Sequence, residues 1–419
     1  MPETMHLHID PSLLSHYIET LGAIGQQAGG GIIRPVYGQA WREARGQLAA
    51  WMNEAGLAVR EDAVGNLFGR LQGRDDTRTI LTGSHIDTVR LGGKYDGALG
   101  VLAGLVALRA LREQVGQPER SLEVAALCEE EGSRFQAHYW GSRGMWGLIQ
   151  PQELETLRDD EGITIAQAMQ AAGFAPERYR EAIRNDLAAF LELHIEQGRI
   201  LFDEHTDIGI VQAIVGMQRQ LITVEGRADH AGTTPMDLRR DALQGAAAMA
   251  LEITRMVEQE GRPAVVTMGQ WDVQPGAFNI VPGWVRFSID LRHPDEATIQ
   301  RLSQTILAIC ERLAGERGLT VFREIVDDSP PAQMDAELQN VLVAAAQACG
   351  ASWKYLPSGA GHDSEVMARH IPAAMLFVPS LEGRSHSPAE HTSLEDAVRG
   401  ATVLATALYR LAYWPTNLG

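Results

Sequence analysis

The chain has 419 residues, of which 45% are hydrophobic and 21% are charged, and its formal net charge is −18. This composition is typical of a globular protein, and the length predicts two or three domains. The acidic balance disfavours nucleic-acid partners, because an acidic surface repels phosphate backbones.

Secretion and membrane insertion are also disfavoured. The N-terminus lacks a basic start followed by an apolar run, so no secretion signal is expected. The densest apolar stretch, residues 97–111, is interrupted by Arg109 and is shorter than the ~18 residues that a membrane span needs, so we expect a buried helix there. Three widely spaced cysteines predict no disulfide framework and a cytoplasmic location: Cys128, Cys310 and Cys349.

The first half of the chain predicts an α/β domain. Residues 10–57 are expected to be mainly helical, and residues 57–73 to form a pair of strands. A strand over 79–86, a helix over 97–113 and a strand over 121–130 follow. This order indicates parallel strands covered by helices. Ligands bind at the carboxyl ends of such strands.

Residues 213–329 predict a second domain of another kind. The expected elements are a strand over 214–226, a helix over 233–259, strands over 264–273 and 279–293, a helix over 295–318 and a strand over 320–326. The order β-α-β-β-α-β is the ferredoxin-like pattern. Helices over 335–349 and 394–412 and a strand over 373–380 then restore the α/β character, so we interpret 213–329 as an insertion into a domain formed by 1–212 and 330–419.

Side chains that commonly bind metals occur where the predicted strands end. They are His85 with Asp87 in GSHIDT, Asp96 in GGKYDGALG, Glu130 and Glu131 in CEEEGSRF, His194 in ELHIEQG and His386 in SHSPAEHTS. Each has a structural alternative: Asp96 could cap a helix, and His194 could be an ordinary core residue. Together they supply imidazole and carboxylate ligands without thiolate, a set that suits Zn, Mn or Co in a paired site.

The local spacing favours hydrolytic chemistry. His85 and Asp87 point to the same side of an extended segment, and metal-binding histidines usually donate their second ring N–H to a carboxylate. We therefore expect Asp87 to orient His85. A carboxylate can bridge two ions about 3.5–4 Å apart, and a neighbouring carboxylate can accept a proton from water. The sequence therefore predicts a two-metal hydrolase.

These motifs resemble those of the M20 metallopeptidase-like family, and of its hydantoinase/carbamoylase branch in particular. The resemblance is carried, in chain order between residues 83 and 390, by GSHIDTV, GGKYDGALG, EEEGSRF, HIEQG, DHAGTTPM, FNIVPG, DLRH, SGAGHD and SHSPAE. Within the branch, HYWGSRGMWG (138–147) and MLFVPSLEGRSHSPAE (375–390) resemble members that act on allantoate.

The resemblance implies a role for each candidate residue. The implied metal ligands are His85, Asp96 as the bridge, Glu131, His194 and His386. Glu130 is implied as the general base and Asp87 as the group that orients His85. Two divalent ions per subunit are implied, with Mn²⁺ expected and Zn²⁺ or Co²⁺ as alternatives.

The resemblance also implies how substrate is held. The implied contacts are Gln197, Arg219, His230, Asn279, Arg292, Gly361 and His362. Arginine suits a substrate carboxylate because its guanidinium can donate two parallel hydrogen bonds. His230 would stabilise the oxyanion of a neighbouring subunit's reaction, which requires a homodimer formed through the inserted lid domain. Without the resemblance, His230 would be interpreted as a helix cap and Arg219 as an exposed strand residue.

The implied reaction is hydrolysis of a carbon–nitrogen bond other than a peptide bond, in a small ureido carboxylate. For allantoate, the products would be ureidoglycine, ammonia and carbon dioxide, in the degradation of purines through allantoin. An N-carbamoyl-L-amino acid is the nearest alternative substrate, because it also carries a ureido group beside a carboxylate. Further alternatives are an aminopeptidase or dipeptidase, and a binding protein with a vestigial site.

Overall fold

The computed structural model describes residues 7–414. Residues 1–6 belong to the segment in which no secretion signal is expected, and they lie outside the described residues. The chain divides into two compact units. The large unit comprises the residues up to Gln212 and those from Met334 onwards, and the small unit comprises Ala213–Gln333. The small unit thus ends four residues beyond the boundary expected from the sequence.

The larger of the two main sheets has nine strands. They are β1 (Ala58–Glu61), β2 (Leu67–Leu71), β3 (Asp75–His85), β4 (Arg120–Leu127), β5 (Leu187–Ile195), β6 (Ile208–Ile214), β14 (Ala332–Gln333), β15 (Trp353–Ser358) and β16 (Ala373–Val378). Their order is β1-β2-β4-β3-β5-β16-β6-β14, with β15 also paired to β6. The central strands β4, β3, β5 and β16 are parallel, whereas β1, β2 and β6 add antiparallel pairs.

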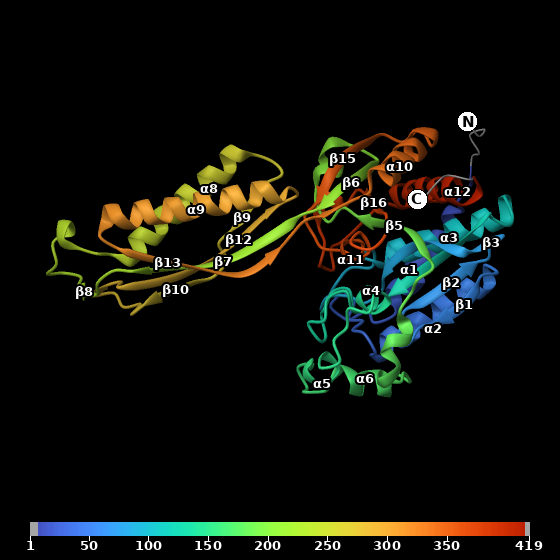
Figure 1. Cartoon of the computed structure of the whole chain (residues 1–419), viewed down its shortest axis with the longest axis horizontal. Coiled ribbons are helices and arrows are strands. Elements are labelled where there is room, and N and C mark those ends of the chain that lie inside the picture. Colours follow the sequence, from blue (N-terminus) through green and yellow to red (C-terminus); the bar gives the residue numbers. More distant parts are fainter. Residues whose placement is uncertain (1–6, 415–419) are drawn as a thin grey trace. The chain divides into compact units, whose positions relative to one another are not determined.

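Helices cover this sheet (Figure 1). The helices of the large unit are α1 (Pro11–Ala23), α2 (Gln39–Glu54), α3 (Ala98–Gln114), α4 (Trp140–Met145), α5 (Glu153–Thr156), α6 (Ile165–Ala171), α7 (Ile200–Glu204), α10 (Ala336–Ala348), α11 (Asp363–Met367) and α12 (Leu394–Tyr413), with the 3₁₀ turns η1 (Pro176–Ala182) and η3 (Leu381–Gly383). Helix α3 is buried along most of its length because it packs on β3 and also against α1 and α12. This burial explains the apolar run over 97–111.

Strand β4 ends earlier than the sequence suggested. The predicted strand ran to residue 130, but β4 ends at Leu127. Glu129 has a φ of +50°, a left-handed conformation that a strand cannot contain. The three consecutive acids therefore lie in a turn at the carboxyl end of β4.

The small unit has a sheet in the order β10-β12-β7-β13, with β9 also paired to β12. Its elements are β7 (Gly216–Glu225), β8 (Asp229–His230), η2 (Met236–Leu238), α8 (Ala242–Glu260), β9 (Val265–Thr267), β10 (Trp271–Gln274), β11 (Ile280–Val281), β12 (Trp284–His293), α9 (Glu296–Arg317) and β13 (Thr320–Ser329). Helices α8 and α9 pack side by side on one face of this sheet (Figure 1). The main elements follow the β-α-β-β-α-β order expected from the sequence.

Three predicted elements of the small unit are shorter than expected or divided, and the first is the strand predicted over 264–273, which forms the separate strands β9 and β10. The helix predicted over 233–259 begins only at Ala242, because the Asp241 side chain caps it by accepting the N–H groups of Leu243 and Gln244. The strand predicted over 279–293 is divided into β11 and β12 at Pro282, which has no N–H for a sheet hydrogen bond.

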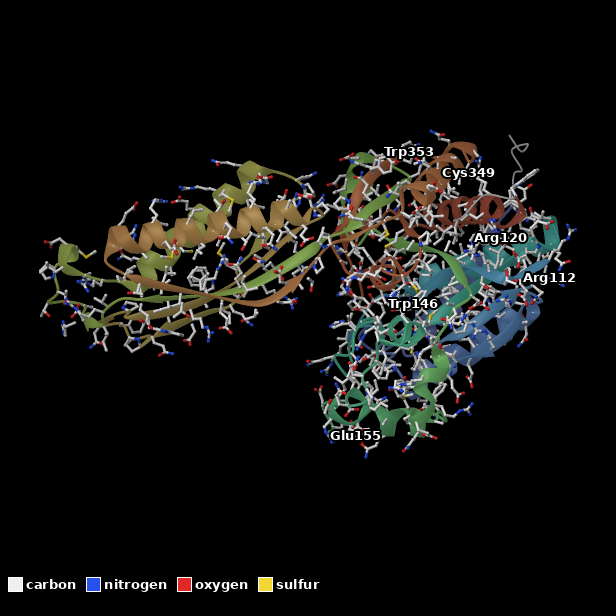
Figure 2. All side chains as sticks on the ribbon, viewed as in Figure 1. Arg112, Arg120, Trp146, Glu155, Cys349 and Trp353 are labelled. Atoms are coloured by element: carbon white, nitrogen blue, oxygen red, sulfur yellow. The ribbon has the colours of Figure 1, made fainter. Side chains whose placement is uncertain are left out.

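Side chains fill the space between the sheets and their helices (Figure 2). All three cysteines are free, including the half-buried Cys349 that follows α10 and is labelled in Figure 2. Among the described residues, no helix is long and apolar enough to cross a membrane.

Candidate metal centre

The parallel strands bring the candidate ligands to one edge of the sheet. His85 is the last residue of β3, and His194 is next to last in β5. Glu130 and Glu131 follow β4, and His386 follows β16. Parallel strands share the edge at which they end, so residues separated by up to 300 positions in the sequence meet there.

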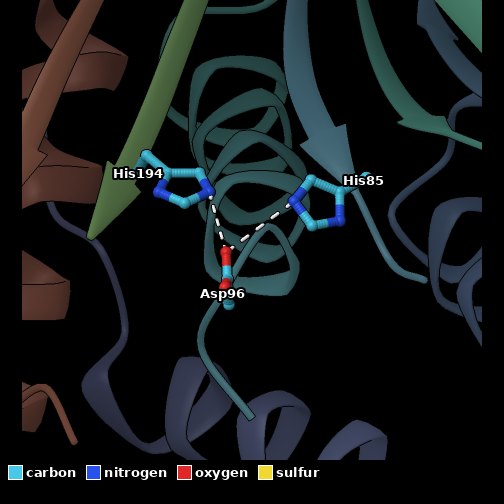
Figure 3. A group of neighbouring side chains, drawn as sticks. All are labelled: His85, Asp96 and His194. Atoms are coloured by element: carbon cyan, nitrogen blue, oxygen red, sulfur yellow. Dashed lines mark ion pairs between the residues drawn. The ribbon is translucent and has the colours of Figure 1, made fainter. Parts of the chain in front are cut away.

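Asp96 joins two of these side chains in a first group, shown in Figure 3. Its Oδ1 atom lies 3.2 Å from His194 Nε2 and 3.8 Å from His85 Nε2. The loop that carries Asp96 immediately precedes α3, and all three side chains are buried. Their ligand atoms lie close enough together to hold one metal ion.

The other carboxylate oxygen of Asp96 belongs to a second group. Asp96 Oδ2 lies 3.2 Å from His386 Nε2, and that nitrogen lies 3.7 Å from Glu131 Oε1. Asp96, Glu131 and His386 again offer ligand atoms within reach of one ion. Asp96 is therefore shared by the two groups, with one oxygen facing each.

The histidine rings are held with Nε2 toward the carboxylates. His85 Nδ1 lies 3.0 Å from the backbone oxygen of Asp87, and His194 Nδ1 lies 3.0 Å from that of Ile195. Because a carbonyl oxygen only accepts, each Nδ1 carries a proton. Although burial opposes it, the neighbouring acids raise the pKa of His85 well above its usual value, and Asp96 raises the pKa of His194. Because a metal binds the lone pair of a neutral ring, an ion bound at Nε2 would replace the proton that these acids favour.

Burial and mutual repulsion shift the pKa values of the acidic side chains. Burial and Glu131 raise the pKa of Glu130 well above its usual range, although His85 lowers it. Burial and Asp96 raise the pKa of Glu131 to about 7. Burial also acts on Asp96, but His194 and His386 hold its pKa well below the usual range. Such a cluster requires positive charge to remain ionised at neutral pH.

The donor set fits divalent cations. Within residues 7–414, none of the four carboxylates forms an ion pair with lysine or arginine: Asp87, Asp96, Glu130 and Glu131. Two buried oxygens, Asp87 Oδ1 and Gln197 Oε1, have no hydrogen-bond partner among these residues. Three imidazoles and several carboxylates in two groups that share Asp96 suit a pair of Mn²⁺, Zn²⁺ or Co²⁺ ions.

The orientation of His85 differs from the sequence prediction. The expected partner was the Asp87 carboxylate, but its Oδ1 lies 3.9 Å from His85 Nδ1, beyond hydrogen-bonding distance. The backbone oxygen of the same residue makes the bond instead. Asp87 Oδ2 accepts the N–H of Glu131 (3.2 Å), so the Asp87 carboxylate positions the acidic turn.

The predicted substrate contacts in the large unit have different surroundings. Gln197 Nε2 donates to Asp96 Oδ2 (3.1 Å), which places its amide beside the metal groups. His362 is only 2% exposed, and its Nε2 faces Ser358 Oγ at 2.9 Å. The His362 ring packs against the ring of His194, a candidate metal ligand. This geometry favours a role in holding His194 in place over the predicted contact with substrate.

Gly361 is exposed in the loop that precedes α11. A Cβ atom at this position would overlap the Tyr139 hydroxyl. Glycine is therefore needed there for this packing, and the approach of substrate to its backbone stays a prediction.

The remaining predicted contacts belong to the small unit, where Asp290 links both arginines. Arg292 Nε donates to Asp290 Oδ1 (2.7 Å), and Arg219 Nε donates to Asp290 Oδ2 (3.3 Å). Asp290 was not among the predicted contacts, although it stands two positions before Arg292 in DLRH and therefore on the same face of β12.

His230 ends β8, and Asn279 lies in the turn just before β11, the strand that pairs with β8. His230 is exposed, and its Nδ1 accepts the N–H groups of Gly232 (3.1 Å) and Thr233 (3.2 Å). The neutral ring therefore carries its proton on Nε2 and can donate outward. The Asn279 backbone oxygen accepts the Ala231 N–H (2.9 Å), and the Asn279 side chain is exposed.

Two residues near the metal groups were missed by sequence reasoning. Arg34 is 1% exposed, and its Nε donates to the backbone oxygen of Ile86 (2.6 Å), between His85 and Asp87. Burial lowers the pKa of Arg34 to about 10, although Asp87 opposes the shift. Glu390 ends the SHSPAE motif and binds the backbone beside Asp96. The motif itself was the available signal for Glu390, whereas Arg34 had none.

Known proteins resemble this chain along almost its entire length. Residues 81–410 match the model of peptidase family M20/M25/M40. An allantoate amidohydrolase of Bacillus subtilis is 41% identical over 404 residues, covering 96% of this chain and 97% of the relative. An N-carbamoyl-L-amino-acid amidohydrolase of Paenarthrobacter aurescens is 40% identical over 386 residues, covering 91% and 94%. The crystal structure of a hydantoinase/carbamoylase family amidase from Burkholderia ambifaria superposes with a TM-score of 0.93 at 35% identity, covering 100% of both chains.

Proposed function

Since the chain belongs to peptidase family M20/M25/M40, we propose that it is a two-metal amidohydrolase that acts on allantoate. The enzyme hydrolyses a carbon–nitrogen bond, as its amidohydrolase relatives do. One ureido group of allantoate would react with one water molecule to yield ureidoglycine, ammonia and carbon dioxide. The observation that carries the proposal is the pair of ligand groups that share Asp96.

The metal ions would be held by His85, Asp96 and His194 on one side and by Asp96, Glu131 and His386 on the other. Two divalent ions at these ligands supply Lewis acidity to the scissile carbonyl and acidify a water molecule. Mn²⁺ is the metal that we expect.

Glu130 is the proposed general base. Its Oε2 atom lies 3.6 Å from His85 Nε2. The Glu130 carboxylate therefore faces the first ligand group, but it is not one of the proposed metal ligands. Glu130 is 7% exposed, and limited access of water favours proton transfer between the carboxylate and the reacting atoms. Glu130 would take a proton from water and deliver it to the leaving nitrogen.

The small unit would supply the substrate contacts. Arg219 and Arg292 offer guanidinium groups to the substrate carboxylate, which would compete with Asp290 for them. His230 would donate its Nε2 proton to the oxyanion, and the hydrogen bonds at Nδ1 fix the required tautomer. Asn279, in the turn before the paired strand β11, would bind the ureido group.

A homodimer formed through the small unit is part of the proposal, with His230 acting in the partner's site. Strand β13 is the last strand of its sheet, and it exposes Phe322, Ile325 and Val326. An exposed edge strand with apolar side chains is suited to pairing with a second copy.

Subunit mixing tests the homodimer. His230→Ala and Glu130→Ala proteins should each be nearly inactive, and co-refolded mixtures should regain activity, because some mixed dimers contain one site with both residues intact. Activity of the mixture that merely equals the average of the two variants would exclude action across a dimer.

N-carbamoyl-L-amino-acid hydrolysis remains the second candidate, because a relative with that activity is 40% identical. A substrate panel separates the two. Protein loaded with Mn²⁺ is assayed on allantoate, N-carbamoyl-L-amino acids and dipeptides, and ammonia and amine are measured. We expect ammonia from allantoate with the highest kcat/KM. A higher kcat/KM on an N-carbamoyl amino acid would overturn the narrower assignment, and turnover of dipeptides alone would overturn both.

A further inference from the structure

We propose that Glu390 is a positioning residue that holds the Asp96 carboxylate between the two ligand groups. The inference rests on the proposed two-metal centre and goes beyond it, because Glu390 is itself absent from both ligand groups. Glu390 is 5% exposed and lies 294 residues from Asp96 in the sequence.

One oxygen of Glu390 binds the backbone that carries Asp96. Glu390 Oε1 accepts the N–H of Tyr95 (2.9 Å) and the N–H of Asp96 (3.0 Å). Hydrogen bonds from N–H groups to a carboxylate are stronger than those between neutral groups. The carboxylate therefore fixes the peptide from which the Asp96 side chain projects.

The other oxygen connects Glu390 to the Asp96 side chain. Ser385 Oγ lies 3.0 Å from Glu390 Oε2 and 3.3 Å from Asp96 Oδ2, so one hydroxyl stands between the two carboxylates. Ser385 immediately precedes His386 in the sequence. Glu390 thus connects the loop that carries Asp96 with the segment that carries His386.

The Asp96 loop depends on such a contact because it is rich in glycine. Glycine populates many backbone conformations, so the sequence GGKYDG does not itself hold Asp96 in one orientation. A Cβ atom at Gly93 would overlap the Glu390 carboxylate, so the loop is shaped to admit this side chain. An Asp96 that turns away from either side would leave one ion without its bridging ligand.

The test compares Glu390→Ala with Glu390→Gln. Glutamine retains a carbonyl oxygen that can accept the two backbone N–H groups, whereas alanine retains no acceptor. We expect Glu390→Ala to bind Mn²⁺ or Co²⁺ about tenfold to a hundredfold more weakly, as for other residues that hold ligands in place. Its kcat at saturating metal should also fall, with little change in KM, and Glu390→Gln should recover most of both losses.

The readouts separate positioning from folding. Metal affinity is measured by titration, the ligand geometry by the absorption spectrum of the Co²⁺ form, and folding by the melting temperature of the metal-free protein. Glu382→Ala is the matched control, because Glu382 is an exposed glutamate in the same segment that pairs with Arg384. Ser385→Ala is a second variant that removes only the link to the Asp96 side chain, and a weaker loss of metal affinity is expected.

The outcomes distinguish this inference from the proposed function. Wild-type metal affinity and kcat in both Glu390→Ala and Ser385→Ala would overturn the inference alone. A Glu390→Gln protein as defective as Glu390→Ala would also overturn it. Failure of the wild-type protein to bind any divalent ion would overturn the two-metal centre and this inference with it.

Discussion

Two buried groups of charge lie along β4, and they are balanced in different ways. Within the strand, Glu123 is fully buried and is surrounded by three arginines. Its oxygens lie 3.2 Å from Arg60, 2.8 Å from Arg70 and 2.9 Å from Arg184. Beyond the carboxyl end of the same strand, the ion pairs of Glu130 and Glu131 within residues 7–414 are with histidines alone.

The pKa values express this difference. Burial tends to raise the pKa of Glu123, but the arginines outweigh it and the net shift is downward. The pKa of Glu130 is shifted upward by burial and by Glu131. Glu123 therefore has its counter-charges within the chain, and the acids at the strand end need theirs from bound cations. The contrast teaches that buried acids whose basic neighbours are histidines indicate a ligand site, whereas a buried acid among arginines indicates structure.

The largest expected effect is on stability, at Glu123 and its three arginines, which we call the structural group. Glu123→Gln should lower the free energy of unfolding by about 3–5 kcal/mol, because it leaves three arginines without their buried partner. Denaturant unfolding with a fixed m-value measures the loss. Metal content should stay at the wild-type value, and loss of metal together with stability would mean that the two groups are coupled.

The next largest effect is on activity, at Glu130 beyond the end of β4. Glu130→Ala should keep its metal ions and lose activity by about a hundredfold or more, because the proton acceptor is removed. Metal analysis and kcat of the same preparation are compared. Parallel loss of metal and activity would identify Glu130 as a ligand and would contradict its role as base.

Removal of metal by a chelator should affect the acids at the end of β4 and leave Glu123 and its arginines unaffected. Removing divalent ions should lower the free energy of unfolding by about 2.7 kcal/mol for each bound ion, relative to protein with free metal at one hundred times the Kd of that ion. The same decrement is expected in the Glu123→Gln variant, because its charges do not depend on cations. An unchanged melting temperature after chelation would contradict the need for cations at the strand end.

The smallest effect is a pH dependence at the edge of the structural group. Burial tends to raise the pKa of Asp186, but its hydrogen bonds with Arg184 lower it from 3.8 to about 2. Its contribution to stability is thus complete above about pH 4 and is lost as the pH falls toward 2. Asp186→Asn should reduce the melting temperature at pH 7, and the difference from wild type should shrink between about pH 4 and pH 2.

A control for this pH dependence is Glu155→Gln on the exposed helix α5, where Figure 2 labels Glu155. This variant should melt at the wild-type temperature at every pH. A difference for Asp186→Asn that stayed constant down to pH 2 would show that the loss comes from packing.

Much of the site could be predicted because a parallel strand carries its ligands at a known end. His85, His194 and the acids after β4 required only the identification of strands and their direction. The choice between the backbone oxygen and the carboxylate of Asp87 could not be predicted, because it depends on a difference between 3.0 Å and 3.9 Å. The contact between Glu390 and the Asp96 backbone joins positions far apart in the chain, which no local pattern records.

The fold was predicted best where apolar periodicity was continuous, as in α3. It was predicted worst at the start of α8, where the apolar and charged pattern of residues 233–241 resembles a helix. The capping hydrogen bonds of Asp241 decide that boundary, and aspartate can equally well stand elsewhere in such a segment.

The position of β16 in the sheet bears on how the protein is made. This strand pairs with β5 on one side and with β6 on the other, although it begins at residue 373. During synthesis, β5 and β6 therefore cannot pair with β16 until the whole of 213–333 has been translated. The small unit is translated before β16, and the hydrolytic centre can be assembled only after β16 and His386 have also left the ribosome.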